Sequence, residues 1–280
     1  MAAPAPAPAP GGDAIKDLLF FIGLIFGLMF LWYFMGGREN RDPNEKPFLE
    51  DPTGTTIGKQ NGSSYQNKIS LSAPYDGRKS NAREEYVVIE SFSNNDSKVN
   101  VTGWSLQNKK GEVATIGQSA EIPYPDQQNT LGNVYLSPGE KIFVNTGPSP
   151  VGPSFRVNEC VGYFNERVPF YPKLTENCPS PTSSEIYPAY IENSCIDFMK
   201  KNIKKCKTTS AVSDLSVQCA EYLTSKTSYQ GCVNDHKNNS NFFQKEWRVF
   251  LNKGSEMWND DSDTILLKDS KGKTVDSINI

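Results

Sequence analysis

Residues 85–106 read EYVVIESFSNNDSKVNVTGWSL, and this stretch decides the fold class. Apolar and polar side chains alternate on both sides of the polar turn at 93–96. Successive side chains of a strand point to opposite faces of its sheet, so this alternation is typical of strands with one buried face. The stretch therefore predicts strands over residues 85–92 and 99–106.

The same alternation recurs farther along the chain, in short runs separated by turn residues. The runs that we expect to be strands are 133–136, 141–144, 247–251, 263–268 and 273–278. Pro138 and Gly139 separate two of them, and this order suits a type II turn because glycine adopts positive φ at little cost. Many short strands with few helices between them predict a mainly β fold of the sandwich kind.

Pieces of this pattern resemble the lamin-tail domain, which is an immunoglobulin-like β-sandwich. The matching pieces are EYVVIE at 85–90, TGWSL at 102–106, LSPGE at 136–140 and the hairpin at 265–276. The chain looks most like the membrane-anchored bacterial forms of this family, which occur in cell-surface proteins. The resemblance implies a sandwich over residues 69–154 and 246–280 with Trp104 in its core, and a binding or scaffolding role without shared catalytic residues.

The N-terminal region predicts a membrane anchor. Residues 1–14 form a low-complexity arm rich in alanine and proline, and residues 18–35 are eighteen residues without a charge. A helix of that length covers roughly 27 Å, close to the thickness of the hydrocarbon core of a bilayer. We expect a transmembrane helix at 15–37 rather than a cleaved signal peptide, because the preceding flank is not basic and no small-residue cleavage site comes after the run. The lipid bilayer is therefore a predicted partner.

Two further features concern the anchor and the segment after it. Gly23 and Gly27 form a G-x-x-x-G pair, which lets two transmembrane helices approach closely. This pair allows a homodimer, or an accessory subunit that joins another membrane protein. Residues 38–68 are polar and rich in Gly, Asn, Asp and Pro, which predicts a flexible stalk.

The insert between the two parts of the sandwich, residues 155–245, contains every cysteine of the chain. They are Cys160, Cys178, Cys195, Cys206, Cys219 and Cys232. Zinc sites use closely spaced cysteines or histidines, which this spacing lacks, and buried free thiols are a second alternative. Disulfides are favoured, and they require an oxidising compartment.

The orientation in the membrane is inferred from the cysteines. We expect a single-pass protein of the cell membrane with its C-terminal domain outside the cytoplasm. Arg38, Arg41 and Lys46 come after the apolar run and weakly favour the opposite orientation under the positive-inside rule. Long domains are translocated largely regardless of charge, so the cysteines carry more weight.

The spacing of apolar residues predicts two helices in the insert, over 190–205 and 214–223. If these helices form an antiparallel hairpin, the cysteines pair in a nested order. That order joins Cys206 with Cys219, Cys195 with Cys232 and Cys160 with Cys178. The alternative is sequential pairing, Cys195 with Cys206 and Cys219 with Cys232. It fails if the partners share one helix, because three turns separate them by roughly 16 Å.

The remaining composition argues against an enzyme and against a nucleic-acid binder. The net charge is −3, whereas nucleic-acid binding is typical of basic domains. His236 is the one histidine and stands in a polar run that we expect to be a loop, so an extracellular hydrolase is the least favoured alternative. No catalytic residue, metal ligand or cofactor is predicted.

Two charged runs leave alternatives open. Residues 259–263 form an acidic loop that fits a solvated surface better than a calcium site, because it lacks the spacing of calcium-binding loops. The lysines within 200–207 form either a solvated helix face or a contact for an acidic cell-wall polymer. We expect a surface protein whose insert recognises a protein or envelope-polymer partner, since long insertions on rigid scaffolds often carry function.

Overall fold

The computed structural model describes residues 19–28, 62–180, 187–208 and 215–280. The chain divides into two compact units, residues 1–58 and residues 59–280. In the first unit, residues 19–28 are helical. Among the four described ranges, no helix combines the length and the apolar character needed to cross a membrane. The predicted arm, the rest of the predicted transmembrane helix and residues 38–61 of the predicted stalk lie outside these ranges.

Gly23 and Gly27 lie within the helical residues 19–28 and are exposed there. A Cβ atom added at either glycine would have no described atom within 4 Å. Helix–helix contact through this pair therefore stays a prediction.

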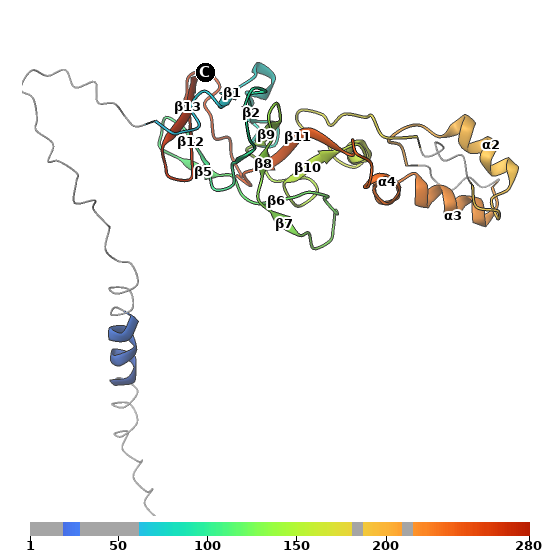
Figure 1. Cartoon of the computed structure of the whole chain (residues 1–280), viewed down its shortest axis with the longest axis horizontal. Coiled ribbons are helices and arrows are strands. Elements are labelled where there is room, and N and C mark those ends of the chain that lie inside the picture. Colours follow the sequence, from blue (N-terminus) through green and yellow to red (C-terminus); the bar gives the residue numbers. More distant parts are fainter. Residues whose placement is uncertain (1–18, 29–61, 181–186, 209–214) are drawn as a thin grey trace, which may run out of the picture. The chain divides into compact units, whose positions relative to one another are not determined.

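The described part of the second unit is mainly β and has 13 strands in three sheets (Figure 1). The seven-stranded sheet contains, in spatial order, β1 (Ile69–Ser72), β2 (Tyr86–Ser91), β9 (Lys141–Asn145), β11 (Phe243–Phe250), β10 (Phe155–Asn158), β6 (Ser119–Ala120) and β7 (Leu131–Gly132). The four-stranded sheet contains β13 (Thr274–Asn279), β12 (Thr264–Lys268), β4 (Ser105–Gln107) and β5 (Val113–Thr115). The third sheet pairs β3 (Val99–Asn100) with β8 (Tyr135–Leu136).

Strand β11 occupies the middle of the seven-stranded sheet. It runs parallel to β9, with Trp247 opposite Ile142, and antiparallel to β10, with Arg248 opposite Phe155. The sheet thereby takes up Phe155–Asn158, which the sequence assigned to the start of the insert. The insert leaves the sheet after β10 and returns to it at β11.

One core joins the apolar faces of the two larger sheets. Val87, Ile142 and Val249 come from the seven-stranded sheet, and Leu106 and Ile265 come from the four-stranded sheet. All five side chains have no exposed surface, as expected where period-two alternation places every second residue on a buried face. The described unit is thus mainly β, as the alternation predicted, and its two larger sheets contribute to one core.

Trp104 lies in this core with 1% of its surface exposed. Its ring centroid is 5.0 Å from that of Tyr65, which belongs to the stretch 62–68. Ser63 anchors the same stretch, because its Oγ donates to Asp269 Oδ2 at 2.7 Å. Residues 62–68, which we expected in the stalk, are therefore packed against the sandwich.

The predicted strand over 99–106 is wrong as a single element. The chain turns after β3, where Trp104 N–H donates to the Val101 carbonyl at 3.1 Å and Gly103 has φ of +83°. Strands β3 and β4 therefore belong to different sheets. The buried positions also change phase here, since Val101 and Trp104 are three positions apart and both buried, whereas a single strand would place them on opposite faces.

The charged residues of the sandwich motifs stabilise the fold. Glu85 is fully buried, and its carboxylate accepts hydrogen bonds from Met257 N–H at 2.8 Å and Trp258 N–H at 3.0 Å. Glu140 accepts from Ser137 N–H at 2.9 Å and from Arg156 Nη2 at 2.8 Å. Both carboxylates thus satisfy backbone donors in turns and loops that would otherwise be unpaired on burial.

Candidate functional site

All six cysteines form disulfides, which confirms the disulfide-bonded insert. The pairs are Cys160–Cys232, Cys178–Cys206 and Cys195–Cys219, and all six residues are buried. The chain has no free cysteine, so the alternatives of zinc-bound and free thiols are wrong.

The nested and the sequential pairings are both wrong, and the helix boundaries explain why. Helix α2 (Asn193–Asn202) ends before Cys206, which has φ of +56° and lies outside any helix. Cys206 is therefore free to turn away from Cys195 and to reach Cys178. Cys232 lies on a third helix, α4 (Tyr229–His236), that the sequence analysis did not expect.

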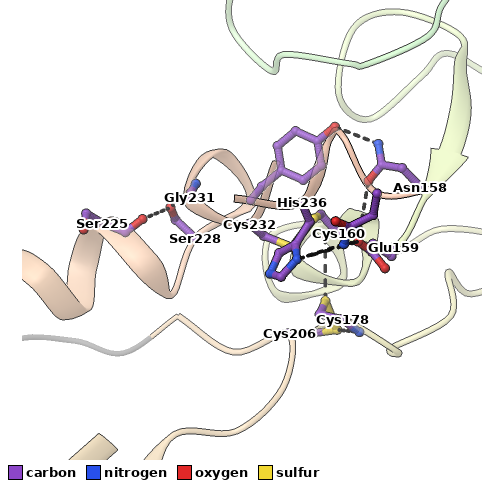
Figure 2. Close-up of a disulfide and its surroundings, with 12 residues drawn as sticks. Asn158, Glu159, Cys160, Cys178, Cys206, Ser225, Ser228, Gly231, Cys232 and His236 are labelled. Atoms are coloured by element: carbon purple, nitrogen blue, oxygen red, sulfur yellow. Dashed lines mark hydrogen bonds and ion pairs between the residues drawn. A yellow bond between two sulfur atoms is a disulfide. The ribbon is translucent and has the colours of Figure 1, made fainter. Parts of the chain in front are cut away.

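The part of the insert nearest the sheet has an aromatic core around two of the disulfides. Cys160–Cys232 and Cys178–Cys206 both belong to this cluster, together with the short 3-10 helix η2 (Val161–Glu166). The ring centroids of Phe164 and Tyr229 are 4.3 Å apart. Figure 2 shows how α4 approaches the end of β10 at this place, where Asn158 Nδ2 donates to the Tyr229 hydroxyl at 3.1 Å.

Gly162 is the position in η2 where a larger residue is excluded. A Cβ atom built there would overlap Cys206 Sγ and lie 3.0 Å from Thr175 O. We expect Gly162→Ala to prevent native formation of the Cys178–Cys206 bond, because the disulfide and the backbone cannot both withdraw in a packed core. Non-reducing peptide mapping of the purified chain will show whether this bond is lost.

Gly117→Ala is the matched control for this change. Gly117 does not have positive φ, and nothing described lies within 4 Å of its Cβ position. The control should retain all three disulfides. If Gly162→Ala also retains them and melts like the wild type, the close contact between η2 and the disulfide is refuted.

The far part of the insert is a helix pair with a separate core. Helices α2 and α3 (Val217–Lys226) are joined near their first turns by Cys195–Cys219. Met199 and Leu223 are the most buried aliphatic side chains of this core, which shares no buried residue with the other two described clusters. Ser216 caps α3 by accepting from Cys219 N–H at 3.3 Å. We call residues 187–226 the distal helix pair.

His236 ends α4 rather than standing in a loop, so that expectation is wrong. Its Nδ1 lies 4.0 Å from Glu159 Oε1 and 3.2 Å from Asn239 Nδ2. Within the described residues these partners are a carboxylate and an amide rather than a hydroxyl or thiol nucleophile. The contacts tie the end of α4 to the residue just after β10 (Figure 2).

Arg248 is the most buried basic residue of the sheet, with 2% of its surface exposed. It donates to Glu246 Oε1 at 2.8 Å and to the Pro172 carbonyl at 2.7 Å, and it stacks on Phe143. Burial lowers the pKa of Arg248, whereas the carboxylate of Glu246 opposes that shift. Because Pro172 belongs to the insert, this guanidinium attaches the insert to β11.

The acidic loop at 259–263 is organised by backbone donors that bind the carboxylate of Asp263. The carboxylate of Asp263 accepts from Lys109 N–H at 2.8 Å, Asn259 N–H at 3.0 Å and Thr264 N–H at 2.7 Å. Across the described ranges, no group of three or more His, Cys, Asp or Glu residues is placed to hold a metal ion.

Two hollows border the junction of insert and sheet. One has a volume of about 200 Å³ and is lined in part by Lys141, Glu159 and Gln244. The other has a volume of about 410 Å³ and is lined in part by Pro150 and Phe170. The first is bordered by strands β9, β10 and β11 together with insert residues, and the second by loops of the insert and of the sheet region, so the space in both depends on the insert.

Sequence reasoning found the insert and its cysteines but missed helix α4 and every pairing. A signal for α4 was present in Ser228, a good N-cap residue whose Oγ accepts from Gly231 N–H at 3.1 Å. The pairings carried no such signal, because they depend on where α2 ends in three dimensions. Comparison of the chain with models of known protein families and with curated proteins found no match.

Proposed function

We propose that this chain is a single-pass membrane protein of the cell surface, in which an immunoglobulin-like sandwich of the lamin-tail type displays the insert as a binding surface. The observation that carries the proposal is the pairing of all six cysteines within the insert. Disulfides persist in oxidising compartments, which supports a location outside the cytoplasm.

The apolar run at 18–35 supports the membrane anchor, since eighteen residues without a charge suffice for a helix of bilayer length. The lamin-tail assignment draws support from the positions of its motif residues. Trp104 of TGWSL is in the core, and Glu140 of LSPGE holds the turn before β9.

A binding role draws support from the construction of the insert. Two of its disulfides fasten it to the sheet region, and the third holds a helix pair with a separate core. A crosslinked helix pair loses less conformational entropy on binding than an unconstrained segment does, which favours recognition. The partner would be a protein or a polymer of the envelope, and no cofactor is required for such a role.

Thiol labelling of intact cells tests the location. Ala5→Cys places a thiol in the arm, and Asn94→Cys places one on an exposed loop of the sandwich. With a membrane-impermeant maleimide and no reductant, we expect Asn94→Cys to react, Ala5→Cys to react only after lysis, and the wild type not to react. Labelling of Ala5→Cys in intact cells, or of the wild type without reduction, would contradict the proposed topology.

Binding to isolated envelopes tests the role of the insert. The full chain in nanodiscs of neutral lipid should bind saturably to envelopes from cells that lack it. In the comparison variant, a short Gly-Ser linker replaces residues 187–226, and Cys178 is changed to Ala because its partner Cys206 is removed. This variant should lose most of the binding while the Cys160–Cys232 bond remains intact. Equal binding by both proteins would show that the recognition surface lies outside the distal helix pair.

A further inference from the structure

The distal helix pair carries a compact set of exposed lysines. Lys200 and Lys201 lie in the last turn of α2, and Lys204 and Lys205 lie just beyond its end at Asn202. We call these four lysines the basic surface. The acidic residue of the same helix is Asp197, which lies three positions before Lys200 and four before Lys201. Four lysines therefore stand against one carboxylate.

Stabilisation of α2 explains the presence of only two of these four lysines. Lysines in the last turn favour a helix because they complement the negative end of its dipole. Lys204 and Lys205 lie beyond the last turn and outside that effect. Throughout the described ranges, none of the four lysines forms an ion pair, whereas neighbouring Lys207 is paired with Glu166 at 3.9 Å.

The backbone that carries the lysines is fixed at both ends. Cys195 precedes them and is bonded to Cys219, and Cys206 comes after them and is bonded to Cys178. Thr208 N–H donates to Glu166 Oε2 at 2.7 Å, which holds the chain just after the second cysteine. The backbone segment that carries the four lysines is therefore held at both ends before any ligand arrives.

We infer that the basic surface binds a linear polyanion of the cell envelope, one that repeats phosphate or carboxylate groups. The inference rests on the proposed function, which places the insert outside the cytoplasm. Lysine ammonium groups act as point charges and lack the planar fork with which arginine reads a single anion. Four lysines and no arginine therefore fit recognition of charge density along a polymer, with strong dependence on salt.

A polymer fits this surface better than a membrane or a nucleic acid. Membrane-binding helices place apolar side chains beside their lysines. The large exposed apolar residues of the pair instead lie away from the last turn of α2, because Tyr190 precedes α2 and Val217 begins α3. Binding of single-stranded nucleic acid relies on stacking aromatics, and none stands within 200–205.

The test measures binding of fluorescent polyphosphate and poly-glutamate to the full chain in nanodiscs of neutral lipid. The variant replaces Lys200, Lys201, Lys204 and Lys205 with Gln. The control replaces four exposed lysines of the sandwich, Lys79, Lys109, Lys110 and Lys271, with Gln and so changes the net charge equally. We expect the variant to bind at least about tenfold more weakly and the control to stay within about twofold. Wild-type affinity should fall steeply as salt rises.

Each other outcome overturns the inference. Equal loss in variant and control means that net charge governs binding rather than this surface. Tighter binding to phosphatidylglycerol vesicles, or to single-stranded DNA, assigns the surface to a membrane or a nucleic acid. Absence of binding to either polymer removes the inference, yet it leaves the envelope-binding test of residues 187–226 unaffected, so the two proposals fail separately. Non-reducing peptide mapping of the variant checks that its three disulfides are native.

Discussion

Replacing Trp104 with alanine is expected to lower the free energy of unfolding of the sandwich by about 3–5 kcal/mol. Trp104 lies in the core that both larger sheets share, with 1% of its surface exposed and its ring against Tyr65. Removing the indole leaves a cavity that the surrounding strands can close only in part. Native domains are stable by only about 5–15 kcal/mol, so this loss removes a large fraction of the stability and should lower the unfolding midpoint strongly.

Urea denaturation of the full chain in detergent, without reductant, measures this effect. Tyr75→Ala is the control, because Tyr75 is 86% exposed and its loss should change the free energy of unfolding by less than about 0.5 kcal/mol. A Trp104→Ala protein whose midpoint matches that of Tyr75→Ala would show that the indole does not hold the two sheets together.

The second large effect is expected from the Cys160–Cys232 bond. It closes a loop with a sequence separation of 72, and the entropy model of crosslinks assigns about 4 kcal/mol to a loop of that length. The bond joins the residues just after β10 to α4, which leads into β11. The double change Cys160→Ala and Cys232→Ala should therefore lower the melting temperature of the sheet as well as that of the insert.

The double change Cys195→Ala and Cys219→Ala is the matched control. That bond lies in the distal helix pair, whose core shares no buried residue with the other described cores. We expect loss of helical circular dichroism from α2 and α3 with little change in the main melting transition. If both double variants lower that transition equally, the insert and the sheet unfold as one cooperative unit.

Most of the sheet could be predicted because its signals are local. Alternation located β2, β9, β12 and β13 to within two residues at each end, since each of these strands has one buried face. The hairpin at Asp269 was visible from its turn residues, and Lys271 and Lys273 N–H both donate to its carboxylate. Local chemistry and final structure agree in these places.

For the insert, the sequence predicted two helices and the presence of disulfides, but not which cysteines pair. Spacing found α2 and α3, yet a disulfide pattern depends on which helix end meets which. The C-terminal end of α2 falls four residues before Cys206, and those few residues redirect that cysteine from the helix pair to Cys178. The place of β10 in the sheet was likewise hidden, because its partner β11 is more than eighty residues away in sequence.

The central position of β11 determines the order in which the chain can fold. Strands β1, β2 and β9 lie on one side of it, and β10, β6 and β7 lie on the other. Lys141 and Glu246 face each other in the parallel ladder although 105 positions separate them. Pairings between distant residues form slowly, because the entropy of closing a long loop is lost before the stabilising contacts form.

A growing chain therefore holds two half-sheets, each with an unpaired edge, until β11 has been synthesised. All six cysteines precede Phe243, so the insert can oxidise while those edges are still open. Open strand edges are the usual starting points of aggregation. A chain that stops before Phe243 would complete its disulfides and still leave both half-sheets ready to pair with neighbouring molecules, so residues 243–280 protect the nascent protein from self-association.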